Sequence, residues 1–292
     1  MSASRFADLV VSSVLLAGLY ATMAYGLSLI YGVLRVVNLA HGGVIMVGAY
    51  LAWVIRDHLG LDPYLAIPVV GAIGFGLGAA IYRGLVRRLP RGPAGGPASL
   101  LLLFGVWLVL RNIAYVLFTG NTHDIHGTYT RSLSLLGLHV ALPRLVLLGV
   151  GAAIAVALHL LLRRTLIGRA IRAAAQNADS CTLVGIDVDA IYALTFGIGT
   201  ALASVAGVLL ATVFPFDPTL GSSELLQSFV VVVLGGLGSI YGVGLAALIV
   251  AAVEQFSVLI LPTYLTTTVG FALLVLVLVL RPGGLFGHRV LS

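Results

Sequence analysis

The sequence predicts an all-α polytopic membrane protein with eight or nine transmembrane helices, on the basis of three observations. Hydrophobic residues make up 60% of the 292 residues and charged residues only 9%. The mean hydropathy is +1.13, and the apolar stretches are too long and too numerous for one soluble core. The 36 glycines are well above the usual share of about 7% and suit helices that pack closely in lipid. We expect residues 1–292 to form a single transmembrane domain.

Nine apolar runs are candidate spans, and the seventh is short and rich in glycine. A short span of this kind is typical of a broken or partly re-entrant segment. The first run follows Arg5 and resembles a signal peptide, but it continues to Val33, which favours a retained span. The runs cover residues 9–30, 42–56, 64–82, 98–118, 143–162, 190–213, 225–241, 242–258 and 264–280.

The basic residues predict the topology. All 16 are arginines, and two groups of four fill the loops around residues 83–91 and 163–172. The positive-inside rule places both loops in the cytoplasm, so the loop at 120–142 and the N-terminus lie outside and the C-terminus lies inside. Nine crossings then fit better than eight, because eleven arginines fall inside and four fall outside. The inside set is Arg35, Arg83, Arg87, Arg88, Arg91, Arg163, Arg164, Arg169, Arg172, Arg281 and Arg289.

The absence of lysine excludes several chemistries. A phosphate-binding loop of the Walker type needs a lysine, so this chain does not hydrolyse ATP by that route. The arginines flank spans without interleaved aromatic residues, so we expect no nucleic-acid partner. We also expect no cofactor and no enzymatic activity. His123, Asp124 and His126 are weak evidence for a metal, because they lie in a loop without regular spacing.

The longest polar interruption, at residues 163–189, still has helical spacing. Leu166, Ile167, Ala170, Ile171 and Ala174 recur on one face of the helical wheel, as in an amphipathic helix. A second, short helix is predicted over 178–184, with a cap at 177, an acid at 179 and a glycine at 185. The segment is either a docking surface or an ordinary helix lying on the membrane. Its single cysteine, at 181, is expected to be reduced and accessible from the cytoplasm.

Two further segments place polar groups or glycines between apolar runs. Residues 31–50 carry Arg35, Asn38 and His41, and polar groups near a membrane core usually have partners or water. These side chains either occupy a turn exposed to cytoplasmic water or fix a broken helix beside the translocation pathway. Residues 230–243 contain a glycine cluster that permits a kink, a helix crossing or close packing. The candidate pathway residues are Asn38, His41, Gly42, Gly235, Gly236 and Gly238.

Only two charged residues lie deep inside the apolar runs. Glu254 either pairs with Arg111 or faces water at the outer end of its helix. A proton relay would need several ionisable groups in series, which disfavours proton coupling. The sequence Ile-Tyr-Gly-Val occurs at both 30–33 and 240–243, and internal repeats of this kind occur in transporters.

Several motifs in this order resemble the permeases of branched-chain amino-acid ABC importers, of the LivH type. They are YGVLR at 31–35, NLAHG at 38–42, AAQN at 174–177, GIDV at 185–188, the GGLGS region within 231–242, and RPGGLFG at 281–287. The resemblance covers nearly the whole chain, although residues 119–142 match nothing and Arg111 is a departure.

The resemblance implies an inner-membrane importer for leucine, isoleucine and valine, or for urea or short amides. It implies a second related permease, two ABC ATPase subunits and an extracytoplasmic substrate-binding protein as partners. The ATPase-coupling residues that it implies are Gln176, Asn177, Ala178, Asp179, Leu183, Val184 and Gly185.

Two other classes are weighed against this interpretation. An ion-driven secondary transporter or channel would need ionisable residues in series across the spans, and the sequence offers only Arg111 and Glu254. An intramembrane enzyme would need paired acids, histidine clusters or a nucleophile at membrane depth, and none is visible.

Overall fold

The structure, a computed structural model, describes residues 3–90, 95–125, 132–135, 138–262, 265–281 and 283–286. All nine apolar runs are helices in it. The first four are α1 (Ala3–Leu34), α2 (Ala40–Leu59), α3 (Ile67–Gly84), which leads into the short 3-10 helix η1 (Val86–Arg88), and α4 (Gly95–Phe118). The others are α5 (Leu142–Arg164), α8 (Val188–Ala211), α9 (Leu220–Gly235), α10 (Ile240–Ser257) and α11 (Thr266–Leu280).

Two short helices and a small hairpin complete the described elements. Helices α6 (Leu166–Gln176) and α7 (Ala178–Leu183) follow α5 directly, as the spacing predicts. Strands β1 (Ser132–Leu135) and β2 (Leu138–Ala141) pair antiparallel, with Ser132 opposite Ala141. The hairpin departs from the purely α-helical prediction and lies in the loop that the sequence motifs leave unassigned.

Six helices in the described ranges are long and apolar enough to cross a membrane: α1, α3, α4, α5, α8 and α10. The polytopic helical class is therefore confirmed, whereas the count of eight or nine spans is not. Helix α9 has 16 residues and α11 has 15, and a bilayer crossing takes about 20. Helix α9 ends at Gly235 because the next residues turn the chain, with φ values of 96° at Gly236 and 83° at Gly238. Helix α10 then starts at Ile240.

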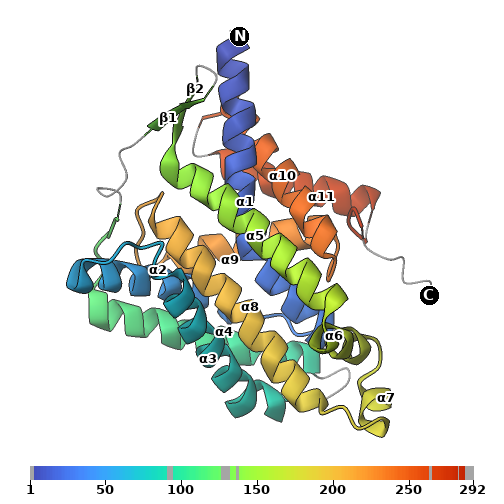
Figure 1. Cartoon of the computed structure of the whole chain (residues 1–292). Coiled ribbons are helices and arrows are strands. Elements are labelled where there is room, and N and C mark those ends of the chain that lie inside the picture. Colours follow the sequence, from blue (N-terminus) through green and yellow to red (C-terminus); the bar gives the residue numbers. More distant parts are fainter. Residues whose placement is uncertain are drawn as a thin grey trace.

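Helices α1 and α8 form the centre of the bundle. Helix α1 packs against α5, α8, α9 and α10, while α8 also packs against α2 and α3 (Figure 1). Small residues allow these close approaches. The backbone of α2 at Gly48 touches Ser204 of α8, and Gly207 of α8 touches the backbone of Ile45. Packing of this kind supplies van der Waals contact where lipid provides no hydrophobic driving force between helices.

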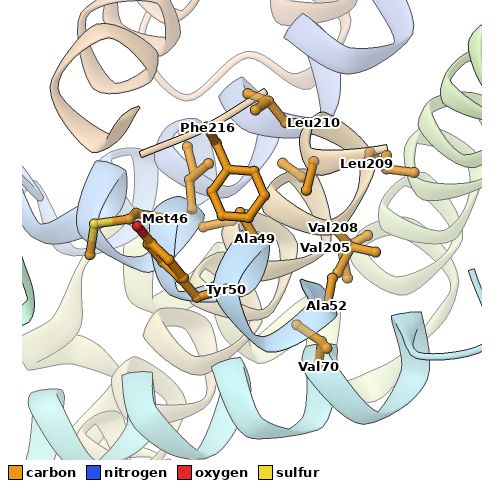
Figure 2. Close-up of a cluster of buried hydrophobic side chains, with 14 of the residues drawn as sticks. Met46, Ala49, Tyr50, Ala52, Val70, Val205, Val208, Leu209, Leu210 and Phe216 are labelled. Carbon is orange, nitrogen blue, oxygen red and sulfur yellow. The ribbon is translucent and has the colours of Figure 1, made fainter. Parts of the chain in front are cut away.

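A tightly packed apolar cluster holds α2 in the bundle. Figure 2 shows Met46 and Tyr50 of α2 facing side chains of α8, with Phe216 placed above them by the loop after α8. The rings of Tyr50 and Phe216 lie edge to face with their centroids 5.1 Å apart. Backbone bonds from His123 N–H to the Phe216 carbonyl at 2.8 Å, and back at 2.9 Å, join the loops that follow α4 and α8.

The two ends of the bundle differ in structure. Helices α6 and α7 project at one end, and the β1–β2 hairpin lies at the other, with α5 running between them (Figure 1). The predicted cytoplasmic segment and the predicted outer loop are thus on opposite ends of the molecule.

Candidate coupling and pathway segments

Three helices, α6, α7 and α8, begin within the segment at 163–189, and a side chain caps the start of each. Thr165 Oγ1 accepts a hydrogen bond from the Gly168 N–H at 2.9 Å at the start of α6. Asn177 Oδ1 accepts from the Ser180 N–H at 3.0 Å at the start of α7. Asp187 Oδ1 accepts from the Ala190 N–H at 3.0 Å at the start of α8. These bonds satisfy amide groups that would otherwise lack partners, so the segment has a fixed local geometry.

The end of α7 depends on a glycine. Gly185 has a φ of +80°, a conformation that side chains with a Cβ rarely adopt. Its N–H donates to the Thr182 carbonyl at 3.2 Å, and the Ile186 N–H donates to the Cys181 carbonyl at 3.0 Å. The helix therefore ends at Leu183, one residue before the predicted end, and the chain turns directly into α8.

Apolar side chains are exposed at the tip of this segment. Leu183 is 87% exposed and Val184 is 74% exposed. Gln176, Asn177 and Asp179 are also exposed, whereas Ala178 is half-buried. Leu183 and Val184 are thus the exposed large apolar side chains among these predicted coupling residues.

One prediction about this segment needs correction. The apolar face of α6 is divided, because Ile171 and Ala174 are buried against the bundle while Leu166 and Ile167 are exposed. Cys181 is buried with an exposure of 4%, since it packs with Ala174 and Val188 under the α6–α7 turn. Its thiol is therefore not accessible, contrary to the expectation.

An ion pair fixes the start of α8 to α3 and η1. Arg87 Nε lies 3.0 Å from Asp189 Oδ2, and the Tyr82 hydroxyl donates to Asp189 Oδ1 at 3.3 Å. On the other side, Arg172 of α6 donates to the Leu162 carbonyl at the end of α5. These contacts join α6 to the end of α5 and the start of α8 to α3 and η1.

The break between α1 and α2 places polar side chains in the bundle interior. Asn38 and His41 each have an exposure of 0%, and only Arg35 is exposed. His41 Nε2 bonds to the Met23 carbonyl of α1 at 2.8 Å, which requires the proton on Nε2 because a carbonyl only accepts. A turn that exposes all three side chains to water is therefore wrong for Asn38 and His41.

The candidate pathway residues separate into two places. Asn38, His41 and Gly42 lie at the start of α2, where a Cβ on Gly42 would overlap the carbonyl of Gly221 in α9. The glycines at 235, 236 and 238 lie near the end of α1, where Gly238 touches Gly32. Residue 32 is nine residues after Met23, or about 13 Å further along the helix.

The second place gathers three of the sequence motifs. Gly242, in one Ile-Tyr-Gly-Val copy, contacts Gly235, and Gly32, in the other copy, contacts Gly238, so both copies lie against the turn between α9 and α10. Within the closing motif, the Leu285 N–H donates to the Leu234 carbonyl at 2.8 Å and the Phe286 N–H to the Gly235 carbonyl at 3.2 Å. The last carbonyls of α9 are satisfied in this way by a segment about 50 residues later in the sequence.

The predicted pair of Arg111 and Glu254 is wrong. Glu254 of α10 accepts hydrogen bonds from the Tyr20 hydroxyl of α1 at 2.6 Å and from the Gln227 amide of α9 at 2.7 Å. Arg111 lies 5.4 Å from the ring centroid of Trp107 and 5.5 Å from that of Tyr115, both on its own helix. Sequence patterns could single out Glu254 as a buried acid, but not partners that lie on other helices.

The described residues contain no group of three His, Cys, Asp or Glu side chains that could hold a metal. His126, the third member of the weak metal candidate, lies outside the described residues.

Comparison with known proteins agrees with the motifs. Residues 9–280 match the family model described as "Branched-chain amino acid transport system / permease component". The LivH permease of Salmonella typhimurium is 33% identical over 95% of this chain and 94% of its own length, and that of Escherichia coli K12 is 32% identical over the same shares. The BraD permease of Pseudomonas aeruginosa is 30% identical over 92% of each chain. No solved structure matches the chain significantly.

The family model covers most of the chain, and the relatives align over nearly their full length. The molecule also has helices suited to crossing a membrane. The chain therefore belongs to the permease-component family of branched-chain amino-acid transport systems, as a transmembrane permease subunit of an ABC importer.

Proposed function

We propose that this chain imports leucine, isoleucine and valine across the inner membrane with energy from separate ATPase subunits. The observation that carries this proposal is the alignment with the high-affinity branched-chain amino-acid permeases, which extends over 94% of their length. The relatives' names specify a branched-chain amino-acid transport system, and this chain shares their whole permease unit. Urea and short amides are alternative substrates of the same machinery.

The α6–α7 segment supports docking of an ATPase subunit. A rigid, capped helix can transmit a displacement that a loose loop would absorb. Its exposed tip offers Leu183 and Val184 to an apolar groove, with polar contacts around them. We assign docking to Gln176, Asn177, Ala178, Asp179, Leu183, Val184 and Gly185.

The complete transporter in this proposal contains four membrane-associated subunits and one soluble protein. This permease pairs with a second, related permease, and each binds one ABC ATPase. An extracytoplasmic binding protein delivers the substrate to the outer loops. The backbone bonds between His123 and Phe216 support this role, because they hold two of those loops together as one surface.

We infer nine crossings, with the N-terminus outside, in one transmembrane domain of residues 1–292. The arginine distribution supports the orientation. Helices α2, α9 and α11 would complete the six longer spans, with α2 and α9 entering the bundle as short or broken helices.

Affinity purification of the tagged chain from its own membranes tests the proposal. We expect two ATPase subunits and a second permease to co-purify, and the complex in liposomes to take up leucine only with internal ATP and the binding protein. Recovery of the chain alone as a stable homo-oligomer would favour an ion-gradient-driven transporter or a channel. Uptake of urea without leucine would retain the mechanism and change the substrate.

A further inference from the structure

The start of α2 holds a concentration of buried polar atoms without partners. Both amide atoms of Asn38 and Nδ1 of His41 have no hydrogen-bond partner, although both residues are fully buried. The N-cap residue of α2, Leu39, has no side chain that could accept from the first amides of the helix. Buried polar groups and helix ends normally have hydrogen-bond partners. Three unpaired side-chain atoms at one place therefore indicate a site for a polar ligand.

The depth of this place in the bundle follows from the His41 contact. Met23, whose carbonyl bonds to His41, lies eleven residues before Leu34, the last residue of α1. That distance is about 16 Å at 1.5 Å per residue, which is close to half the thickness of a bilayer core of about 30 Å. Residues 35–38 are not helical and return along α1 to that depth. Met23, and with it the N-terminus of α2, thus lies well inside the candidate span Phe6–Leu34.

The unpaired atoms comprise both donors and acceptors. Nδ2 of Asn38 is the unpaired donor, and it lies beside the positive end of the α2 dipole, which favours an anion. The backbone N–H of His41, in the first turn of α2, already donates to the Asn38 carbonyl at 3.2 Å. Because Nε2 of His41 carries the proton, Nδ1 of the neutral ring is an acceptor, as is Oδ1 of Asn38. One ligand that presents an anionic and a cationic group close together would complement all of them.

We propose that the start of α2 binds the zwitterionic head group of an α-amino acid during translocation. The substrate carboxylate accepts from the Asn38 amide group beside the positive end of α2, while its ammonium group donates to Asn38 Oδ1 and His41 Nδ1. This proposal rests on the proposed import function and specifies its recognition chemistry. Ureas and sugars lack this pair of opposite charges.

The buried acid of the bundle is a weaker candidate for the same role. Glu254 already accepts bonds from Tyr20 and Gln227, and Gly270 of α11 lies against its carboxylate, where an added Cβ would be 3.0 Å from Oε1. Its chemistry is therefore largely complete within the chain. The hydrogen bonding at the start of α2 is incomplete, because both side-chain polar atoms of Asn38 and Nδ1 of His41 lack a partner.

The packing around the site allows it to open. Gly42 contacts Gly221 of α9 backbone to backbone, with the Leu225 side chain beside this crossing. Neither glycine places a side chain between the two backbones, so a separation of the helices there would open space directly at the start of α2. Alternating access in transporters with broken helices involves movements of this kind around a central site.

The decisive experiment uses the assembled complex with its binding protein in liposomes, and photo-leucine as the probe. This leucine analogue carries a diazirine in its side chain and keeps the α-amino and carboxylate groups. We expect ATP-dependent photolabelling of this chain within the α1–α2 region around Met23 and Asn38. Excess leucine should suppress the labelling, whereas leucinamide, which lacks the carboxylate, and 4-methylpentanoate, which lacks the ammonium group, should not.

A variant series gives an independent result. Asn38→Asp keeps the size of the side chain but repels a carboxylate, so leucine uptake should fall roughly tenfold or more. Asn38→Leu should give a similar loss with normal assembly. The matched control, Gly84→Asp, adds an acidic side chain at an exposed position at the end of α3, where an added Cβ meets no other atom, and should leave uptake within twofold.

The outcomes separate the two proposals. If the wild-type complex takes up no leucine, the import function itself is wrong. The head-group site is overturned if the complex takes up leucine normally, the photolabel lies in other segments, and Asn38→Asp transports within twofold of wild type. The unpaired atoms of Asn38 and His41 would then bind only ordered water. The labelling of the wild-type complex needs no variant, so it decides the question even if Asn38 substitutions fail to assemble.

Discussion

The α6–α7 segment and the start of α2 differ in the hydrogen bonding of their polar side chains. In the first, Thr165, Asn177 and Asp187 each cap a helix that begins at the next residue, and Asn177 and Asp187 are exposed while Thr165 is half-buried. In the second, Asn38 and His41 are buried, and the helix start has no side-chain cap. The capping side chains of the α6–α7 segment thus have partners within the chain, whereas the buried polar side chains at the start of α2 retain unpaired atoms.

This difference separates two kinds of function. A docking element needs a fixed shape before its partner arrives, and local hydrogen bonds provide it. A translocation site needs polar groups that remain free until the substrate arrives, because groups already paired within the protein would compete with it. The free energy cost of leaving buried polar atoms unpaired is about 1–3 kcal/mol for each. Tight helix packing around them offsets this cost.

The largest effect is expected at the glycine crossing beside Asn38. Gly42→Val would place a side chain into the Gly221 carbonyl, so α2 and α9 must separate and the bundle should lose about 1–3 kcal/mol of stability or more. We expect a lower yield of folded protein and a lower Tm in detergent.

Gly76→Val is the matched control, because Gly76 is a helical glycine of α3 with no atom within 4 Å of an added Cβ. An unchanged Tm for Gly42→Val would contradict the close packing of α2 on α9 and remove the constraint that keeps the polar atoms buried.

The next effect concerns the end of α7. Gly185→Val forces a β-branched residue to a φ of +80°, at a cost of about 1–2 kcal/mol, so the turn should shift and ATPase binding should weaken by several fold. Co-purification of the ATPase and surface-based affinity measurements would test this expectation.

The control is Gly84→Val, because Gly84 also has open space but an ordinary backbone conformation at the same end of the bundle. Normal docking of Gly185→Val would count against the role of the α7 turn.

A smaller effect is expected at the ion pair that joins α8 to η1. Reversal of either charge, Arg87→Asp or Asp189→Arg, should lower the uptake per ATP hydrolysed by several fold, since α7 would no longer move α3 together with α8. The effect on unfolding free energy should be only about 0.2–1 kcal/mol, because the pair is partly exposed.

The double swap, Arg87→Asp with Asp189→Arg, should restore much of the coupling ratio. A double swap no better than the single variants would show that the pair does not transmit movement.

The smallest effect concerns thiol reactivity in the coupling segment. Cys181 is buried, so it should react with a maleimide slowly, whether or not the ATPase is bound. Thr182→Cys in a Cys181→Ala background places a thiol at the neighbouring exposed position, which should react fast and become protected by the ATPase. Fast labelling of Cys181 in the isolated permease would mean that α7 does not pack as the structure describes.

Features set by neighbouring residues could be predicted from the sequence, whereas features set by contacts between helices could not. The nine helical segments and the cap at Asn177 depend on runs of neighbouring residues, and the structure confirms them. The burial of Cys181 depends on which face of α7 meets the bundle, and the expectation that its thiol is accessible was wrong. The number of crossings was not fixed either, because α9 and α11 fall below the length that composition alone can assign to a span.

The site residues show the same division. The motif around Asn38 and His41 drew attention to them, but only the three-dimensional arrangement shows that they are buried at the depth of Met23 with atoms unpaired. The cluster of Tyr20, Gln227 and Glu254 joins three helices that are far apart in the sequence, so no local signal could predict it.

The sequence by itself determined the membrane environment, the helical segments, the capped helix starts within residues 163–189 and the family, because these follow from composition and from residues within a few positions of one another. Only the tertiary structure decided which polar groups have partners, where the two glycine crossings lie, and how the motif at 31–35 and the two late motifs meet at the end of α9. The physical reason is that burial and hydrogen bonding between helices depend on how whole helices pack, and a backbone contact such as Gly42 with Gly221 leaves no pattern in the neighbouring residues.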